Sequence, residues 1–266
     1  MYPLRIATIN LCAENPIDPN ILIKKWGILL CKYKIDILFI QEISTYNIEK
    51  FASYLGMKML HINNFDGTCV FINPNKLSIV DNNHITLTKQ ESSKSATGDP
   101  LRLHSKPIYI GGLHLDDIPS LSHHMNNMVY NSSEIIPLSY TMPQLLKLCK
   151  ERRLPRLNEE LKNIKETDIA IIAGDFNEPS HVDLDKHIKI PISTELVKKG
   201  FIDTYRHINK DSPGYTWPTG NFYKDEPDQR IDFIYTKNIK IVGSETVGTG
   251  AKWLSDHKML ITDIVI

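Results

Sequence analysis

The segment 35–41 constrains the fold most, because its residues, IDILFIQ, are almost all apolar. A strand buried on both faces has this composition, and such strands occur in sheets that helices cover. Ahead of it, residues 4–10 (LRIATIN) read as a short strand. Between the two, Asp18-Pro19 predicts a helix start, and residues 21–33 carry apolar side chains at helical spacing. This strand–helix–strand succession predicts an α/β fold.

The rest of the chain continues this alternation. Further strands are expected at 68–73, 107–115, 168–173, 231–236, 239–247 and 259–265. Helices are expected at 48–55, 143–154, 157–165 and 193–199. No internal repeat or flexible linker interrupts the pattern, so we expect one domain over residues 1–266. Residues 116–140 are polar and lack periodicity, which is typical of a functional loop.

Composition narrows the classes of function. Lys+Arg and Asp+Glu both number 31, so the formal net charge is zero and a globally basic, nucleic-acid-binding surface is absent. The chain has no apolar run of the roughly 20 residues that span a bilayer and no recognisable export signal. The four cysteines are scattered and form no CxxC pair, and three of them, Cys12, Cys31 and Cys69, adjoin apolar residues, which indicates buried thiols in a reducing compartment. We expect a cytoplasmic monomer, with signal-less export left open.

Polar residues cluster where the expected strands end. Because strand ends in an α/β sheet support the loops that meet substrate, these clusters are expected to form one site. The clusters are Asn10, Gln41-Glu42, His114, Asp175-Phe176-Asn177, Asp232 and Asp256-His257. Singly, each has an ordinary structural explanation, such as an Asx turn at Asp175 or a loop cap at Asp256.

The acidic residues of these clusters could bind a hard cation and accept a proton. Mg²⁺ takes oxygen ligands and keeps several waters, so one or two carboxylates suffice to hold it. Glu42 and Asp256 are the candidate metal ligands, with the amide of Asn10 as a neutral ligand or orienter. Asp175 can take a proton from an attacking water.

The remaining residues of these clusters could contact a phosphoryl group. Asn177 can donate to a phosphoryl oxygen, and the imidazoles of His114 and His257 can stabilise charge that develops there. Asp232 is the candidate partner of His257, because an aspartate hydrogen-bonded to a catalytic histidine fixes its tautomer. Together these residue types predict hydrolysis of a phosphate ester.

The ordered set resembles the endonuclease/exonuclease/phosphatase superfamily, which has the deoxyribonuclease-I-like fold. The matching motifs include Gly174-Asp175-Phe176-Asn177, Arg230-Ile231-Asp232-Phe233-Ile234 and Ser255-Asp256-His257, and the resemblance spans residues 5–265. It implies a four-layer α/β sandwich with two mixed sheets packed face to face and helices outside. It also implies Mg²⁺ or Mn²⁺, water attack on phosphorus in one step, and the residue roles given above. Abasic-site nucleases in this family often carry an acidic residue where this chain has Cys12, which argues against that activity.

The substrate is the open question, since this fold serves many phosphate esters. Neutral charge favours a small or lipid-linked phosphate ester, with a DNA or RNA nuclease as the alternative and a non-catalytic binding module as a third class. Arg206, Trp217 and Arg230 are candidate substrate-binding residues, because aromatic walls plus arginine suit a phosphorylated ligand. The basic stretch 147–156 is interpreted as a solvated helix face, and residues 116–140 as the segment that selects the substrate.

Overall fold

The computed structural model describes residues 1–12, 15, 17–43, 48–63, 67–88, 106–130, 132–184, 188–219, 223, 225–248, 250 and 253–266. Two six-stranded mixed sheets form its centre. The first has the order β11 (Lys240–Val247), β12 (Met259–Val265), β1 (Pro3–Asn10), β2 (Ile37–Gln41), β4 (Thr68–Ile72), β3 (Lys58–Asn63). The second has the order β5 (Leu77–Ile79), β6 (His84–Leu87), β7 (Ile108–His114), β8 (Ile169–Asp175), β10 (Asp232–Lys237), β9 (Ile202–Asp203).

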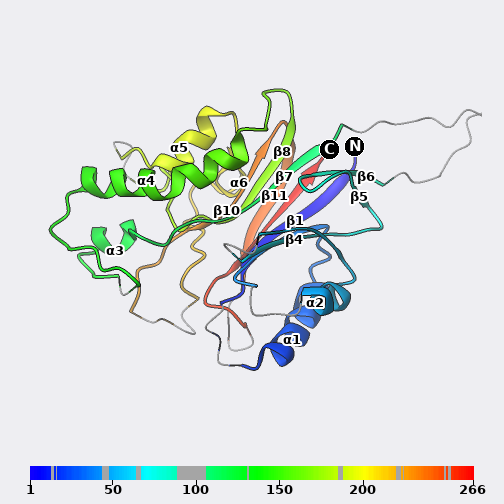
Figure 1. Ribbon diagram of the computed structural model, residues 1–266, viewed down its shortest axis with the longest axis horizontal. Helices are drawn as coiled ribbons and strands as arrows, with labels where there is room; N and C mark the ends of the chain where they lie inside the picture. Colours follow the sequence, from blue (N-terminus) through cyan, green and yellow to red (C-terminus); the bar gives the residue numbers. More distant parts are fainter. Residues whose placement is uncertain are drawn as a thin grey trace, which may run out of the picture.

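Six helices accompany these sheets in the described ranges. They are α1 (Pro19–Cys31), α2 (Ile48–Leu55), α3 (Leu121–Met125), α4 (Met142–Leu161), α5 (Pro191–Lys198) and α6 (Thr204–Ile208). Figure 1 shows α1 and α2 on the outer side of the sheet that contains β1 and β4, and α4 and α5 on the outer side of the sheet that contains β8 and β10. The four-layer sandwich is therefore confirmed.

Strand periodicity explains the layers. In β1, Ile6 packs between the sheets with Phe39 and Ile171, whereas Ala7 and Ile9 pack on the opposite face with the helices α1 and α2. Successive side chains of a strand point to opposite faces, so a strand that is apolar on both can sit between two layers. On the second sheet, the outer face packs against apolar residues of α4 and α5.

Two helices that were expected to be separate form one continuous helix. The sequence predicts separate helices at 143–154 and 157–165, but α4 is continuous from Met142 to Leu161 and contains Pro155. Proline removes one helical hydrogen bond and ordinarily ends a helix. Here Cys149 before Pro155 and Leu157 after it are both fully buried, so packing on each side holds the helix together.

Other differences concern short elements. The strands β3, β5, β6 and β9 and the short helices α3 and α6 were not predicted, since few of them carry a complete apolar period. Helix α3 gives part of the segment 116–140 a regular structure. None of the helices in the described part of the chain is both long enough and apolar enough to cross a membrane.

Candidate active site

Strand register places the polar residues in one row. In the second sheet, β7 and β8 are parallel with His114 paired to Asp175, and β8 and β10 are antiparallel with Asp175 paired to Asp232. In the first sheet, β1 and β2 are parallel and Asn10 is paired to Gln41, which precedes Glu42. The polar ends of five strands thus gather at neighbouring edges of the two sheets.

Asn10 joins the two sheets at this edge. Its Nδ2 donates to Glu42 Oε1 at 2.8 Å and to Asp175 Oδ2 at 3.1 Å, and its Oδ1 accepts from the backbone N–H of Cys12 at 3.0 Å. The amide nitrogen, not the oxygen, therefore faces the carboxylates. Of the two roles expected for Asn10, this arrangement supports the orienter rather than the metal ligand.

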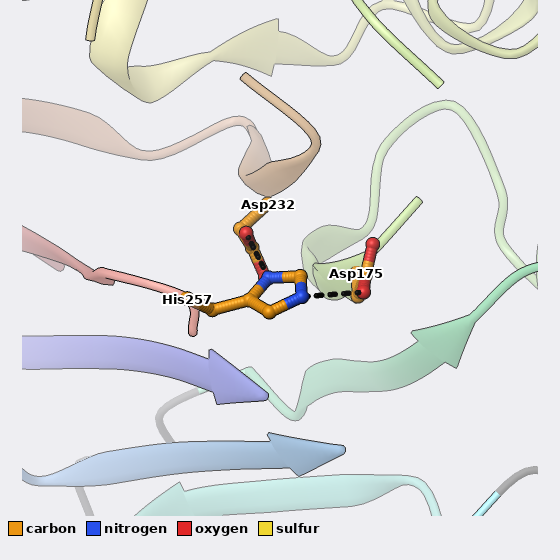
Figure 2. Close-up of side chains that lie close together, drawn as sticks. All are labelled: Asp175, Asp232 and His257. Atoms are coloured by element: carbon orange, nitrogen blue, oxygen red, sulfur yellow. Dashed lines mark hydrogen bonds and ion pairs between the residues drawn. The ribbon is translucent and has the colours of Figure 1, made fainter. Parts of the chain in front are cut away.

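His257 lies between two buried carboxylates (Figure 2). Its Nδ1 is 2.9 Å from Asp232 Oδ2, and its Nε2 is 3.8 Å from Asp175 Oδ2. The Asp232–His257 pair expected from the sequence is present. Since Nδ1 pairs with Asp232, the ring is held with Nε2 directed at Asp175.

The pKa values at this cluster are strongly shifted. Burial raises the pKa of Asp175 to about 6, and the Asp232 carboxylate adds to the effect while His257 and His114 oppose it. Burial alone would lower the pKa of His257, but the carboxylates of Asp232, Asp256 and Asp175 outweigh it and raise that pKa well above its ordinary value. Perturbed groups of this kind concentrate at functional sites.

His114 and Glu42 form the accessible side of the cluster. His114 Nε2 lies 3.9 Å from both Glu42 Oε1 and Asp175 Oδ2. The side chains of His114 and Glu42 are 21% and 29% exposed, whereas that of Asp175 is 1% exposed. A phosphate or a cation that enters the cavity therefore meets His114 and Glu42 directly.

Asp256 reaches the same cavity from the loop before β12. Trp217 Nε1 donates to Asp256 Oδ2 at 2.9 Å, and the neighbouring Ser255 Oγ donates to the backbone oxygen of Asn10 at 2.7 Å. Burial, followed by the charges of Asp256 and Glu42, raises the pKa of the Cys12 thiol, and all three residues line the cavity. Trp217, expected to bind substrate, lines the cavity and also positions Asp256.

The backbone around Asp175 requires a glycine before it. Gly174 has φ of 150°, and a Cβ at this position would lie 1.8 Å from the backbone oxygen of Leu113. Only glycine lets β8 approach β7 this closely. Beyond Asp175, the chain turns with the Asn177 N–H donating to Asp175 Oδ1 at 2.9 Å, and Asn177 Nδ2 donates to the backbone oxygen of Leu115 at 2.9 Å. Asn177 is thereby fixed at the cavity lining.

The donor set fits a hard divalent cation. Glu42, Asp175 and Asp256 bring carboxylates to one cavity, and oxygen ligands are those that Mg²⁺ and Mn²⁺ prefer. Ligand atoms of Asp175, Asp232 and His257 lie within 4.8 Å of one another. In addition, Asp232 Oδ1 is buried without a hydrogen-bond partner among the described residues, which is costly unless positive charge is nearby.

The cavity itself has a volume of about 1050 Å³. Besides the cluster, it is lined by Asp116, Asp117, Ser120, Tyr130, Ser132 and Ser133 of the segment 116–140, and by Tyr223, Glu226 and Gln229. Arg152 and Arg156 of α4 also line it, although the sequence interpretation placed the stretch 147–156 on a solvated face. Their i,i+4 spacing was the signal that both could face one site.

Arg206 and Arg230, which were expected to bind substrate, are not among the residues that line the cavity. Arg230 donates to both carboxylate oxygens of Asp203, at 3.0 and 2.7 Å, and to Asp183 at 2.9 Å. Arg206 donates to Asp183 at 2.6 Å and to three backbone oxygens. Both guanidinium groups therefore form ion pairs outside the cavity lining.

The chain is similar to several known proteins. Residues 13–257 match the model of the Endonuclease/Exonuclease/phosphatase family. An uncharacterized protein of Caenorhabditis elegans is 29% identical over 149 residues, which cover 49% of this chain and 47% of that protein, so the chain spans about half the length of this curated relative.

Two solved structures have a similar fold. TDP2 of D. rerio, complexed with a single-strand DNA product, has a TM-score of 0.59 at 14% identity, over 99% of each chain. An AP endonuclease from Archaeoglobus fulgidus has a TM-score of 0.59 at 18% identity, over 99% of this chain and 100% of that one. At these identities the likeness concerns the fold alone.

Proposed function

Since the chain belongs to the endonuclease/exonuclease/phosphatase family, whose members are hydrolases acting on phosphate esters, we propose that it hydrolyses a phosphate ester by attack of water on phosphorus. The observation that carries the proposal is the position of Asp175. This buried carboxylate lies within 3.9 Å of the imidazoles of both His114 and His257, beside Glu42 in the cavity. A proton acceptor, two cationic or donor groups and a metal ligand thus surround one point.

Glu42 and Asp256 would hold a Mg²⁺ or Mn²⁺ ion. Their carboxylates share the neighbourhood of Cys12, and hydrogen bonds from Asn10 and Trp217 orient them. When bound, a divalent cation would polarise a phosphoryl oxygen and offset the charge that develops on it. Outer hydrogen bonds of this kind fix the orientation of ligating groups.

The protein's own groups would move the proton and hold the phosphate. Asp175 would accept the proton of the attacking water, because it is the most deeply buried of the carboxylates that line the cavity. Asp232 would keep His257 oriented, with Nε2 available to a phosphoryl oxygen. His114, reached directly from the cavity, and Asn177 would contact the same phosphoryl group.

A small phosphate ester is the substrate class that the cavity favours. Six carboxylates line it, those of Glu42, Asp116, Asp117, Asp175, Glu226 and Asp256, against two arginines, Arg152 and Arg156, and two imidazoles, His114 and His257. Such a lining would repel most of the negative charges of a long polyanion, since like charges at short range are unfavourable. We place the segment 116–140 as the determinant of substrate choice, because it supplies much of this lining.

Nuclease activity is the second candidate. It is favoured by the likeness in fold to TDP2, which was solved with a single-strand DNA product, and by Arg152 and Arg156 at the cavity, which could contact a backbone phosphate. Cleavage of plasmid or RNA that increases as salt is lowered would support this candidate over the small ester.

Metal-dependent hydrolysis by the purified protein tests the proposal. The substrates are bis-p-nitrophenyl phosphate, p-nitrophenyl phosphate, sphingomyelin, supercoiled plasmid and single-stranded RNA, each with Mg²⁺, Mn²⁺ or a chelator. Asp175→Asn removes the proton acceptor, and Asp211→Asn makes the same change at an exposed position. We expect metal-dependent turnover that Asp175→Asn abolishes and Asp211→Asn retains. Equal turnover in wild type and Asp175→Asn would exclude Asp175 from the mechanism.

A further inference from the structure

One wall of the cavity carries hydroxyl and carboxylate groups rather than apolar side chains. It consists of Asp117, Ser120, Tyr130 and Ser132 from the segment 116–140 together with Glu226, and we call it the polar wall. None of these five residues belongs to the catalytic cluster. A ligand whose phosphate lies at that cluster would therefore place the rest of the molecule against the polar wall.

A buried histidine fixes two members of the polar wall. The side chain of His123 is 0% exposed; its Nδ1 lies 2.6 Å from Ser120 Oγ, and its Nε2 pairs with Glu226 Oε2. The ring also lies against Tyr130, at 4.7 Å between centroids. Since Ser120 and Glu226 are 106 residues apart in sequence but share one imidazole, the hydroxyl and the carboxylate are held in a fixed relation.

A second hydroxyl–carboxylate unit lies in the same segment. Ser132 Oγ donates to Asp117 Oδ2 at 2.5 Å. Burial, followed by the Asp117 carboxylate, raises the pKa of Tyr130, so its phenol stays protonated beside Asp117. Each carboxylate has about four lone-pair positions, so Asp117 and Glu226 keep room to accept further hydrogen bonds.

This chemistry selects among ligands. An acyl chain would displace water from the polar wall without offering hydrogen bonds in exchange, which is unfavourable for polar groups that lose water. A second phosphate beside Asp117 and Glu226 would meet two negative charges. An alcohol with several hydroxyl groups, in contrast, donates to the carboxylates and to the lone pairs of the serine and tyrosine oxygens. The rings of Trp217 and Tyr223, 5.7 Å apart between centroids and tilted by 40° to each other, add apolar surface for its C–H groups.

We propose that the polar wall binds the polyhydroxylated alcohol portion of the substrate, so that the substrate is a phosphate ester of a sugar-like polyol. Ser120 and Glu226 are the residues that determine this specificity, and His123 positions both. The inference rests on the proposed phosphoesterase function for its placement of the phosphate, but the binding preference itself does not require turnover.

A matched pair of ligands tests the preference. Glucose 6-phosphate and cyclohexylmethyl phosphate share the phosphate and the ring size, and only the former carries ring hydroxyls. Their affinities are measured by calorimetry with the Asp175→Asn protein in millimolar Mg²⁺. We expect glucose 6-phosphate to bind at least about ten-fold more tightly, since a site built to bind hydroxyl groups rejects an analogue that lacks them.

Variants of the polar wall then assign the preference to its residues. Ser120→Ala and Glu226→Gln, each in the Asp175→Asn background, should lower the ratio of the two affinities by about five-fold or more, as expected for one hydrogen bond. Ser139→Ala, at an exposed position outside the cavity, should leave the ratio unchanged. Equal affinities for the two ligands, or a ratio that neither variant lowers, would overturn the inference.

Failure of the proposed function gives a different result. Wild-type turnover of bis-p-nitrophenyl phosphate reports on hydrolysis without using the polar wall. Turnover without the ligand preference overturns the inference alone, whereas the preference without turnover supports it and contradicts the proposed function.

Discussion

Replacement of Arg153 by methionine tests how strongly this side chain stabilises the packing of the segment 116–140 and the loop after β8 against α4. The side chains of Arg153 and Glu178 are 0% and 1% exposed, with Arg153 Nη1 at 3.1 Å from Glu178 Oε1. Arg153 also donates to the backbone oxygens of Asp116, at 2.6 Å, and Pro119, at 2.8 Å. Glu178 follows the Asp175 turn and accepts from the backbone N–H of Ile192 at 3.0 Å. One buried cation thus ties α4, the segment 116–140 and the loop after β8 together.

The loss of stability can be worked from these contacts. In Arg153→Met, the Glu178 carboxylate stays buried and keeps one backbone donor, while two carbonyl groups lose theirs. Breaking a buried ion pair from one side costs about 3–5 kcal/mol. For a chain of this size, each kcal/mol lowers the melting temperature by about 2–4 °C, so we expect a decrease of about 6–20 °C. Arg152→Met is the matched control: its pairs with Glu134 and Asp116 lie at the surface, and such pairs contribute about 0–1 kcal/mol.

The pH dependence of the unfolding free energy gives a second test, because its direction can be predicted. Burial raises the pKa of Glu178, and Arg153 opposes this. Cys149, the other titratable group at the pair, stays a neutral thiol because burial raises its pKa to about 12. Without Arg153, the pKa of Glu178 in the folded state rises further above the unfolded value of about 4.3. The folded variant then binds more protons than the unfolded chain, so its stability falls as pH increases.

Urea unfolding, followed by tryptophan fluorescence, provides the measurement at about pH 5.5 and about pH 7.5. We expect the difference in unfolding free energy between wild type and Arg153→Met to be larger at the higher pH. The reasoning is refuted if Arg153→Met is no less stable than Arg152→Met, or if its deficit increases as the pH is lowered.

Three further substitutions test the site. Glu42→Gln should raise the Mg²⁺ concentration for half-maximal rate by about ten-fold or more, since a carboxylate ligand is lost; an unchanged Mg²⁺ titration would remove Glu42 from the metal ligands. Asp232→Asn should lower kcat by about 10²–10⁴-fold with an unchanged circular dichroism spectrum, because His257 loses the partner that fixes its tautomer; a kcat near that of wild type would contradict the positioning role. Trp217→Phe removes the donor to Asp256 and should lower kcat/KM by about ten-fold, whereas an unchanged kcat/KM would limit that bond to a structural role.

The sequence predicted the arrangement of the site better than its details. Apolar runs that end in a polar residue, as at Asn10 and His114, indicate a strand and a site together, and strand register then brings these ends into one row. The Asp232–His257 contact also followed from residue types. Side-chain orientation does not follow from such patterns: the amide nitrogen of Asn10 faces the carboxylates, which only the surrounding donors decide.

The positions of the arginine side chains did not follow from the sequence. Arg206 and Arg230 adjoin site motifs in the sequence, but Asp183 and Asp203 bind them away from the cavity. Arg152 and Arg156, far from any motif, line it. An arginine side chain reaches across several residues, so its destination depends on which carboxylates the fold brings near. That information resides in the tertiary structure and not in local spacing.

The hydrogen bond from Asn10 to Asp175 has a consequence for how distant substitutions act. It spans the two sheets, so its length depends on how far apart they are held by the apolar core between them, which includes Ile6, Phe39 and Ile171. A larger or smaller side chain in that core shifts one sheet against the other, because protein interiors are close-packed and transmit strain. Repacking chosen only to increase thermal stability would therefore also change the distance between the carboxylates of Asp175 and Glu42, which Asn10 joins.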